Sequence, residues 1–304
     1  MREHCDNSSA FMMIQRFLDY LKFERNRSDL TVKNYGDDLR AFETFCKDQE
    51  EPISWEAVDA DVIRNWMEHM MDKGNNATSI NRRLSALRSF YRFALSRKLV
   101  SKDPAHSITG PKRSKPLPQF LKEREMDRLL QPDLWTDGYE DVRNRTIVMT
   151  FYETGIRLSE LTGLDDDAVD FVNHQLKVTG KRNKQRIIPF GDELDSALRS
   201  YIERRNAELT NRTEGLFLTS KGERITPEQV RKSVQRNLSK VCTLKKRSPH
   251  VLRHTFATAM LNNKAGIESV KKLLGHESLT TTEIYTHTTF EQLKREYSDA
   301  HPRA

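Results

Sequence analysis

A proline-dense basic segment divides this chain in two. Between Asp103 and Pro118 the sequence carries four prolines and a glycine, and four basic residues lie in or beside the segment. Prolines at this density interrupt both helices and strands, because each one fixes φ and lacks a backbone donor. The segment therefore predicts a linker at residues 103–118 between a domain at 8–102 and a second domain at 119–304. A length of 304 residues suits two hydrophobic cores.

The first domain has the apolar periodicity of helices. Apolar residues recur at three- and four-residue spacing in four stretches, which is typical of amphipathic helices packed in a bundle. The predicted helices cover Phe11–Leu21, a stretch that begins near Ser28, a stretch from Asp59 or Asp61 to Gly74, and Thr78–Leu99. The aromatic residues of these stretches are expected in the core rather than as platforms for nucleic-acid bases.

The second domain mixes helices with one hairpin. Two short runs, Gln175–Val178 and Arg186–Phe190, flank a turn at Thr179–Lys184 that holds Gly180 and Asn183, so the sequence predicts a β-hairpin there. The fold class expected is mainly α with a small β-hairpin. The predicted helices are Lys122–Leu130, Asp141–Glu153, Ser159–Leu161, Glu193–Glu208, Pro227–Val241, His250–Asn262, Glu268–Leu274 and Phe290–Tyr297.

Composition excludes several classes of protein. No apolar run approaches the roughly 20 residues that span a bilayer, and the first ten residues do not resemble a signal peptide. The three cysteines lie far apart without metal-ligand or redox spacing, which favours a cytoplasmic protein over a disulfide framework. We find no Walker loop and no cluster of carboxylates, so no cofactor and no metal is expected.

The net charge of +7 is concentrated in clusters. Basic and acidic residues balance over residues 1–110, yet the stretch from Gly74 to Lys102 contains basic residues and no acid. A second basic region extends from Lys221 to Arg253. Such runs are often ordinary solvated helix faces, but two in one chain indicate binding to DNA phosphates. The candidate DNA-binding residues are Arg82, Arg83, Arg88, Arg92, Lys112 and Arg113.

Five motifs follow one another in the second domain. They are Thr154–Leu161 (TGIRLSEL), Gly180–Arg186 (GKRNKQR), His250–His254 (HVLRH), Leu274–His276 (LGH) and Thr281–His287 (TTEIYTH). Together they resemble the tyrosine recombinase (phage integrase) family over nearly the whole chain, and the C-terminal end is similar to the XerC/XerD subfamily. Each motif alone is weak, since a single arginine, histidine or tyrosine usually has a structural role. The ordered set is specific.

The resemblance implies a reaction and a set of roles. Tyr285 would attack a DNA phosphate and form a 3′-phosphotyrosyl intermediate, while Arg157 and Arg253 hold the phosphate oxygens. Lys181 would protonate the leaving 5′ oxygen, with Lys184 as a nearby rival. His250 is assigned to proton transfer with the tyrosine and His276 to a hydrogen bond with the phosphate. Glu160 either orients Arg157 or caps the helix that follows it.

The resemblance also implies an architecture and partners. The first domain would be a SAM-like four-helix core-binding domain, the second an α+β catalytic domain, and the two would close as a C-shaped clamp on DNA. The expected partners are duplex DNA with inverted half-sites, a tetrameric synapse with a Holliday-junction intermediate, a paralogous recombinase, and a DNA translocase such as FtsK. The last helix would dock on a neighbouring protomer, with packing on its own domain as the alternative.

Other functions stay open at this stage. Xer-type resolution of chromosome or plasmid dimers in the nucleoid is favoured over an integrase or invertase of a mobile element. A type IB topoisomerase would use the same chemistry without strand exchange. A noncatalytic DNA-binding relative is a further alternative, although six intact catalytic candidates argue against it.

Overall fold

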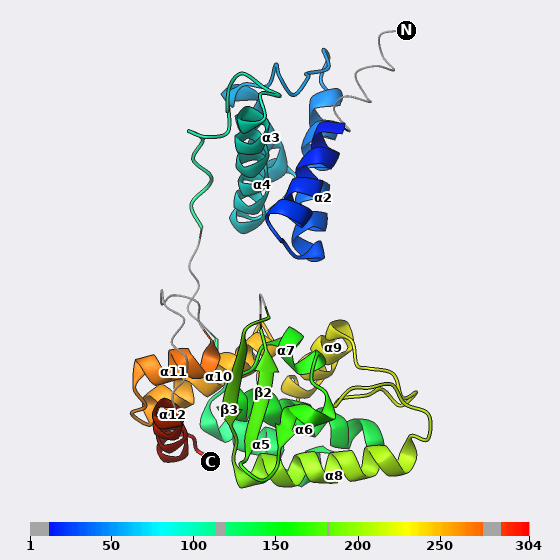
Figure 1. Ribbon diagram of the computed structural model, residues 1–304, viewed down its shortest axis with the longest axis vertical. Coiled ribbons are helices and arrows are strands. Elements are labelled where there is room, and N and C mark those ends of the chain that lie inside the picture. Colours follow the sequence, from blue (N-terminus) through cyan, green and yellow to red (C-terminus); the bar gives the residue numbers. More distant parts are fainter. Residues whose placement is uncertain (1–11, 114–118, 181–182, 276–286, 304) are drawn as a thin grey trace. The chain divides into compact units, whose positions relative to one another are not determined.

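The protein is described by a computed structural model that covers residues 12–113, 119–180, 183–275 and 287–303. The chain forms two compact units, Met1–Pro116 and Leu117–Ala304, and each encloses its own hydrophobic core. Figure 1 shows a purely helical first unit, and a second unit of helices with a small sheet along one side.

The first unit is a bundle of four helical segments. The first segment covers residues 12–19 and continues as a π-helical turn at Tyr20–Glu24. The three others are α2 (Asp29–Lys47), α3 (Ala60–Asp72) and α4 (Ala77–Ser96). All four were predicted, and the expected cap Ser28 accepts a hydrogen bond from the amide of Thr31 at 3.4 Å.

Aromatic side chains fill the core of the first unit. Phe17, Phe42, Trp66 and Phe90 are fully buried, and the Phe42 and Trp66 rings meet edge to face with centroids 4.8 Å apart. Large aromatic rings contribute much of the buried apolar area of a small domain. The prediction that these residues form the core is confirmed.

Part of the predicted linker packs on the first unit. Ala105 and Ile108 are buried in its core, and Arg88 of α4 donates to the carbonyl of Ala105 at 3.2 Å and to that of Ile108. The amide of Asn81 donates to the carbonyl of Pro111 at 2.8 Å. These bonds hold the backbone of residues 105–111 beside α4. The side chains of Arg88 and Asn81 donate to carbonyls that would bind water in a free loop.

The second unit contains the remaining elements. Its helices are α5 (Glu123–Leu130), α6 (Tyr139–Thr154), α7 (Leu158–Thr162), α8 (Asp192–Glu208), α9 (Pro227–Leu238), α10 (Pro249–Asn262), α11 (Ile267–Leu274) and α12 (His287–Ala300). Its strands are β1 (Val169–Asp170), β2 (Gln175–Thr179) and β3 (Gln185–Pro189), joined as an antiparallel sheet in the order β1-β2-β3. Short 3₁₀ turns occur at Pro132–Leu134 and Asp166–Ala168. The predicted helices and hairpin are present, whereas the two-residue β1 was not predicted.

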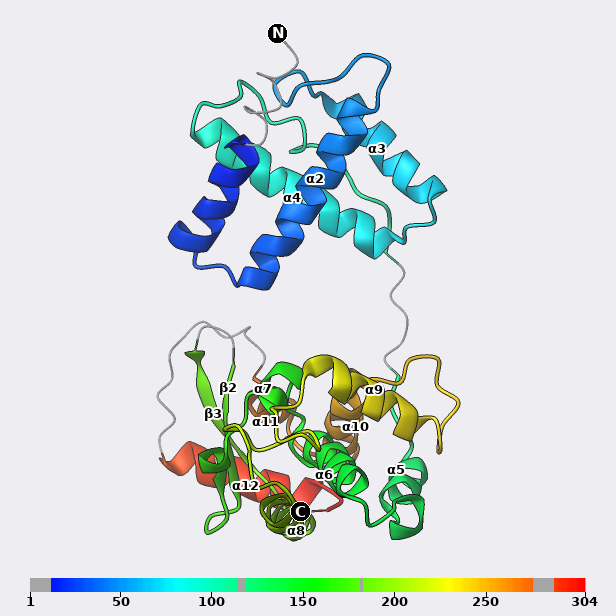
Figure 2. The same ribbon diagram turned by 90° about the vertical axis from the view of Figure 1, so that its right-hand side faces the viewer.

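Helix α6 is the centre of the second unit. Every residue from Thr146 to Thr154 is buried, because α6 packs against α8, α9 and α10 (Figure 2). A helix covered on all sides is typical of a domain interior. Its end therefore has a fixed position, and α7 begins four residues later.

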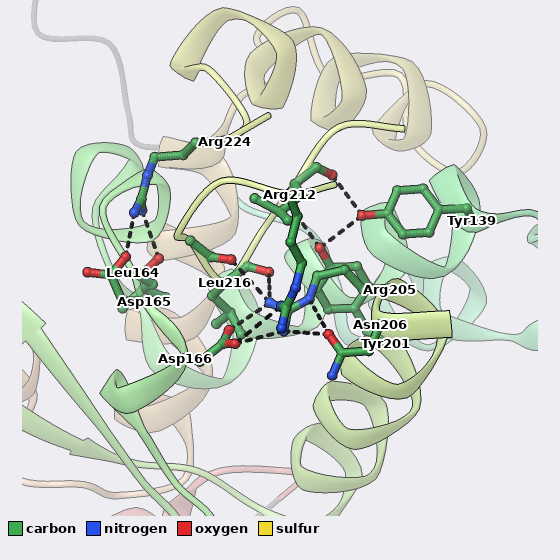
Figure 3. Close-up of polar contacts among 12 residues, drawn as sticks. Tyr139, Leu164, Asp165, Asp166, Tyr201, Arg205, Asn206, Arg212, Leu216 and Arg224 are labelled. Atoms are coloured by element: carbon green, nitrogen blue, oxygen red, sulfur yellow. Dashed lines mark hydrogen bonds and ion pairs between the residues drawn. The ribbon is translucent and has the colours of Figure 1, made fainter. Parts of the chain in front are cut away.

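A buried arginine connects α8 with the loop that leads to α9. Arg205 is fully buried and donates to both oxygens of Asp166 at 2.6 and 2.8 Å, as well as to the carbonyls of Gly215 and Leu216 at 3.1 and 2.9 Å. Figure 3 shows this network beside Tyr201, whose hydroxyl accepts from the amide of Leu218 at 2.9 Å. The network satisfies backbone groups of a segment without regular structure.

Helix α12 packs on its own domain, against α10 and α11. Tyr297 and Ala300 are buried, and the imidazole Nε2 of His301 lies 3.2 Å from the carbonyl oxygen of Tyr152. Arg303 forms ion pairs with Asp127, at 2.8 Å, and with Glu193. In this single chain the last helix thus has the alternative position, on its own domain, because Tyr297 and Ala300 belong to the core of that domain. Of the helices in the described ranges, none is long and apolar enough to span a membrane.

Candidate active site

Arg157 lies at the N-terminus of α7, directly after a tight turn. Helix α6 ends at Gly155, which has a left-handed backbone (φ 59°), and a Cβ there would lie 2.5 Å from a ring carbon of Phe256. Glycine is thus required on steric grounds as well as conformational ones. The turn places Arg157, whose side chain is one-third exposed, at the surface of the site.

Glu160 binds Arg157 in two ways. Its Oε2 accepts the backbone amide of Arg157 at 2.7 Å, and its Oε1 accepts the guanidinium Nη1 at 2.9 Å. The first bond caps α7, and the second orients the arginine, so both roles considered for Glu160 are present together.

Arg186 is a second guanidinium on the same carboxylate. It donates through Nη1 to Oε1 of Glu160 at 2.7 Å and through Nη2 to Oε2 at 2.9 Å. Burial raises the pKa of Glu160, but the hydrogen bonds and charges of Arg186 and Arg157 outweigh it and lower that pKa to about 2. Glu160 therefore carries a permanent negative charge between two arginines.

Sequence reasoning missed Arg186, although the hairpin motif ends on it. The alternation of residues along β3 contains a signal that could have identified Arg186. Arg186 pairs with Val178 across the sheet and precedes the buried Ile188 by two residues, so it lies on the inward face. A charged residue on an inward face needs a partner, but that partner is 26 residues away in the sequence, in α7.

Arg253 reaches the site from α10. It is largely buried and donates to the carbonyl of Gly155 at 2.5 Å and to that of Leu274 at 2.7 Å. Burial, together with the nearby charges of Arg157 and Arg186, lowers its pKa to about 10. Arg253 remains charged at neutral pH, and its position is fixed by two backbone carbonyls.

The three arginines meet at the C-terminal end of α11. Arg186 donates to the carbonyl of Leu273 at 2.9 Å, Arg253 to that of Leu274, and Arg157 to that of Gly275 at 2.6 Å. The last carbonyls of a helix lack partners within the helix and carry partial negative charge, so cations stabilise them. Three consecutive carbonyls thus gather three guanidiniums from separate parts of the sequence.

Two of the predicted phosphate ligands are therefore brought together. Arg157 and Arg253 bind neighbouring residues of the α11 end, and His276 is the next residue of the chain. Guanidiniums are suited to hold phosphate oxygens because they present several donors in one plane. The predicted site residues Lys181, His276 and Tyr285 lie outside the described residues.

His250 lies in the first turn of α10 with a partly exposed side chain. Its pKa is lowered by partial burial and by the positive charges of His254, Arg253 and Arg231. A lowered pKa keeps the imidazole neutral at physiological pH, so it can accept a proton. The side chain of His254, also on α10, is exposed.

The candidate DNA-binding arginines of α4 differ in their surroundings. Arg82 and Arg83 both pair with the buried Asp38, the latter at 3.7 Å, and Arg88 binds the backbone of the segment after α4. Arg82 is exposed despite this pairing, as are Arg92, Lys112 and Arg113. Within the described ranges, no group of three His, Cys, Asp or Glu side chains could hold a metal ion.

Comparison with known proteins gives matches over both units. The profile of the phage integrase family matches residues 119–292, and that of the phage integrase N-terminal SAM-like domain matches residues 14–98. Tyrosine recombinase XerC of Chlorobaculum tepidum is 40% identical over 95% of this chain and 94% of its own length. Tyrosine recombinase XerD of Oceanobacillus iheyensis is 34% identical over 96% of this chain and 98% of its own length.

Solved structures share the fold. The Tn1549 transposon integrase in complex with transposon right end DNA has a TM-score of 0.72 at 20% identity and covers 94% of this chain, with 98% of its own chain matched. XerH bound to a palindromic difH substrate has a TM-score of 0.71 at 21% identity, with coverage of 96% and 89%. The expected fold, a SAM-like N-terminal domain with a helical catalytic domain and a small sheet, is confirmed.

Proposed function

Because this chain belongs to the phage integrase family of tyrosine recombinases, we propose that it breaks and rejoins duplex DNA at a specific site through a covalent bond to Tyr285. The observation that carries the proposal is the meeting of Arg157 and Arg253 at the end of α11, immediately before His276. The two guanidiniums come from α7 and α10, and their convergence gives a DNA phosphate two fixed cationic ligands.

The reaction exchanges one phosphodiester for another. The phenol oxygen of Tyr285 attacks phosphorus, the bond from phosphorus to the 5′ oxygen breaks, and a 3′-phosphotyrosyl bond forms. A phenol with a pKa near 10 is a weak nucleophile, so Arg157 and Arg253 must stabilise the charge that develops on the phosphorane. Rejoining is the same exchange in reverse, and the energy of the broken bond is retained in the protein–DNA link.

Two proton transfers accompany the exchange. The imidazole of His250 would accept the proton of the Tyr285 phenol, since burial, together with neighbouring positive charges, lowers its pKa and keeps the ring unprotonated at neutral pH. Lys181, which lies in the sequence between β2 and β3, would donate a proton to the departing 5′ oxygen. His276 would add a hydrogen bond to the phosphate.

The remaining parts of the chain would bring DNA and other protomers to this site. We propose residues 8–102 as the core-binding domain, 103–118 as the segment that joins it to the catalytic domain at 119–304, and the exposed Arg82, Arg92, Lys112 and Arg113 as contacts to DNA phosphates. Similarity to XerC and XerD favours resolution of chromosome or plasmid dimers in the nucleoid. That role implies a tetramer on inverted half-sites, a paralogous recombinase as partner and a DNA translocase such as FtsK.

The test begins with the DNA site. The full-length protein would select its site from a pool of random duplexes, and the selected duplex would then be nicked so that the cleaved strand cannot be rejoined. With this nicked duplex, wild type should form an adduct that survives denaturation, and Tyr285→Phe should form none. Failure of the wild type to form the adduct, or its persistence in Tyr285→Phe, would contradict the proposal.

A further inference from the structure

Arg186 connects three segments that surround the site. It lies on β3, its guanidinium binds both oxygens of Glu160 in α7, and its Nε binds the carbonyl of Leu273 at the end of α11. Each of these segments leads directly to a proposed catalytic residue. The hairpin bears Lys181, α7 follows Arg157, and α11 precedes His276.

The carboxylate of Glu160 is shared equally between two arginines. Its Oε1 accepts from Nη1 of both Arg157 and Arg186, and its Oε2 accepts from Nη2 of Arg186 and from the backbone amide of Arg157. Arg186 therefore donates two of these four hydrogen bonds. Without it, the carboxylate would keep only the contacts to the residue that it has to orient.

Two glycines lie against this arrangement. A Cβ on Gly180, the residue before Lys181, would lie 3.3 Å from Oε1 of Glu160, and one on Gly275 would lie 3.1 Å from Nη1 of Arg186. The backbone on both sides thus approaches the ion pair closely. A shift of the Arg186 guanidinium would be transmitted to the residue before Lys181 and to the residue before His276.

Arg186 itself is directed at protein rather than substrate. Its Nε, Nη1 and Nη2 all donate to protein oxygens, and only 9% of its side chain is exposed, against 33% for Arg157. Each of the three guanidinium nitrogens of Arg186 is thus already hydrogen-bonded within the protein.

We propose that Arg186 is a positioning residue, which acts through Glu160 to hold the phosphate-binding guanidinium of Arg157 in the geometry that cleavage requires. The inference rests on the proposed function, since it assigns Arg186 a part in that reaction. It predicts that Arg186 controls the rate of cleavage far more than the affinity for DNA.

The experiment measures single-turnover adduct formation on the selected nicked duplex, and the dissociation constant of the same duplex. Arg186→Met, which removes all three contacts, should slow adduct formation about 100-fold, and Arg186→Lys about tenfold. The lysine keeps the positive charge, so its defect reports geometry and not charge. The dissociation constant should change less than about threefold in both variants.

A double-mutant cycle tests the route through Glu160. If Arg186 acts through this carboxylate, adding Arg186→Met to Glu160→Gln should slow adduct formation at most about threefold beyond Glu160→Gln alone. The matched control is Arg205→Lys, which disrupts another buried arginine that binds a carboxylate and carbonyls. Its adduct rate should stay within about twofold of wild type.

Two results would overturn the inference: adduct rates within about twofold of wild type in both Arg186 variants, or defects that multiply fully in the double mutant. Circular dichroism shows whether each variant is folded. If Arg186→Met does not fold, the adduct rate of Arg186→Lys alone tests the inference. If wild type forms the adduct and both Arg186 variants form it at the same rate, this inference is refuted but the proposed function is not. Absence of any adduct with wild type would refute the proposed function.

Discussion

Replacing Glu160 by glutamine removes the negative charge that two guanidiniums share. The carboxylate is almost completely buried, with 1% of its side chain exposed, and the pKa is lowered from 4.5 to about 2. Each pKa unit corresponds to about 1.4 kcal/mol between the two protonation states, so the ionised form stabilises the folded protein by about 3 kcal/mol. Glu160→Gln should lower the free energy of unfolding by about that amount at pH 7.

The pH dependence follows from the direction of the shift. A folded-state pKa below the unfolded one means that the stabilisation is complete above about pH 5. It is lost as the pH falls from about 4.5 to about 2, because the unfolded chain takes up the proton first. The difference between wild type and Glu160→Gln should therefore shrink across this interval and approach zero near pH 2.

The measurement is urea unfolding between pH 7 and pH 3, followed by hydrogen–deuterium exchange of peptides from α6, α7 and β3, which report the second unit specifically. Comparing the variant with wild type at each pH cancels the titration of all other groups. A difference that stays constant from pH 7 to pH 3 would refute the argument, since the lost stability would then not come from the charge of Glu160.

Three further predictions concern buried polar groups of the same unit. Burial raises the pKa of Glu153 well above its ordinary value, so the carboxyl opposes folding at neutral pH. Glu153→Gln should be at least as stable as wild type in urea at pH 7, and a clear loss of stability would count against it. Arg205→Met leaves the carbonyls of Gly215 and Leu216 without their donor and should cost about 3 kcal/mol; a loss below about 1 kcal/mol in thermal unfolding would disagree. Burial lowers the pKa of His301 to about 4, so amide-exchange protection of α12, corrected for intrinsic rates, should fall between about pH 6.5 and pH 4, but not in His301→Phe.

Local signals in the sequence predicted most of the fold. Helix starts such as Ser28 and Asp59 were recognised because a short polar side chain before an apolar periodic run caps the first turn. The hairpin was recognised from Gly180 and Asn183 between two short strand-like runs. Strand β1 was missed because two residues carry no periodicity, and its pairing with β2 depends on tertiary contacts.

The site was predictable only as a set of chemical groups. The motifs indicated Arg157, Glu160 and Arg253, but no local pattern shows that the carbonyls of Leu273 to Gly275 gather three guanidiniums. For the arginines of α4, the sequence indicated a function but did not reveal their partners within the protein. The absence of acidic residues around them indicated binding to DNA, whereas Arg88 binds carbonyls of the segment after α4, because the backbone there needs donors.

The central claim is that Tyr285 carries the DNA during the reaction. The most direct measurement is digestion of the denatured protein–DNA adduct with a protease and a nuclease, followed by mass spectrometry of the peptide that retains nucleotides. The account predicts a nucleotide 3′-phosphate linked to Tyr285 and to no other residue. A nucleotide attached to another residue, or attached through a 5′-phosphate, would contradict it.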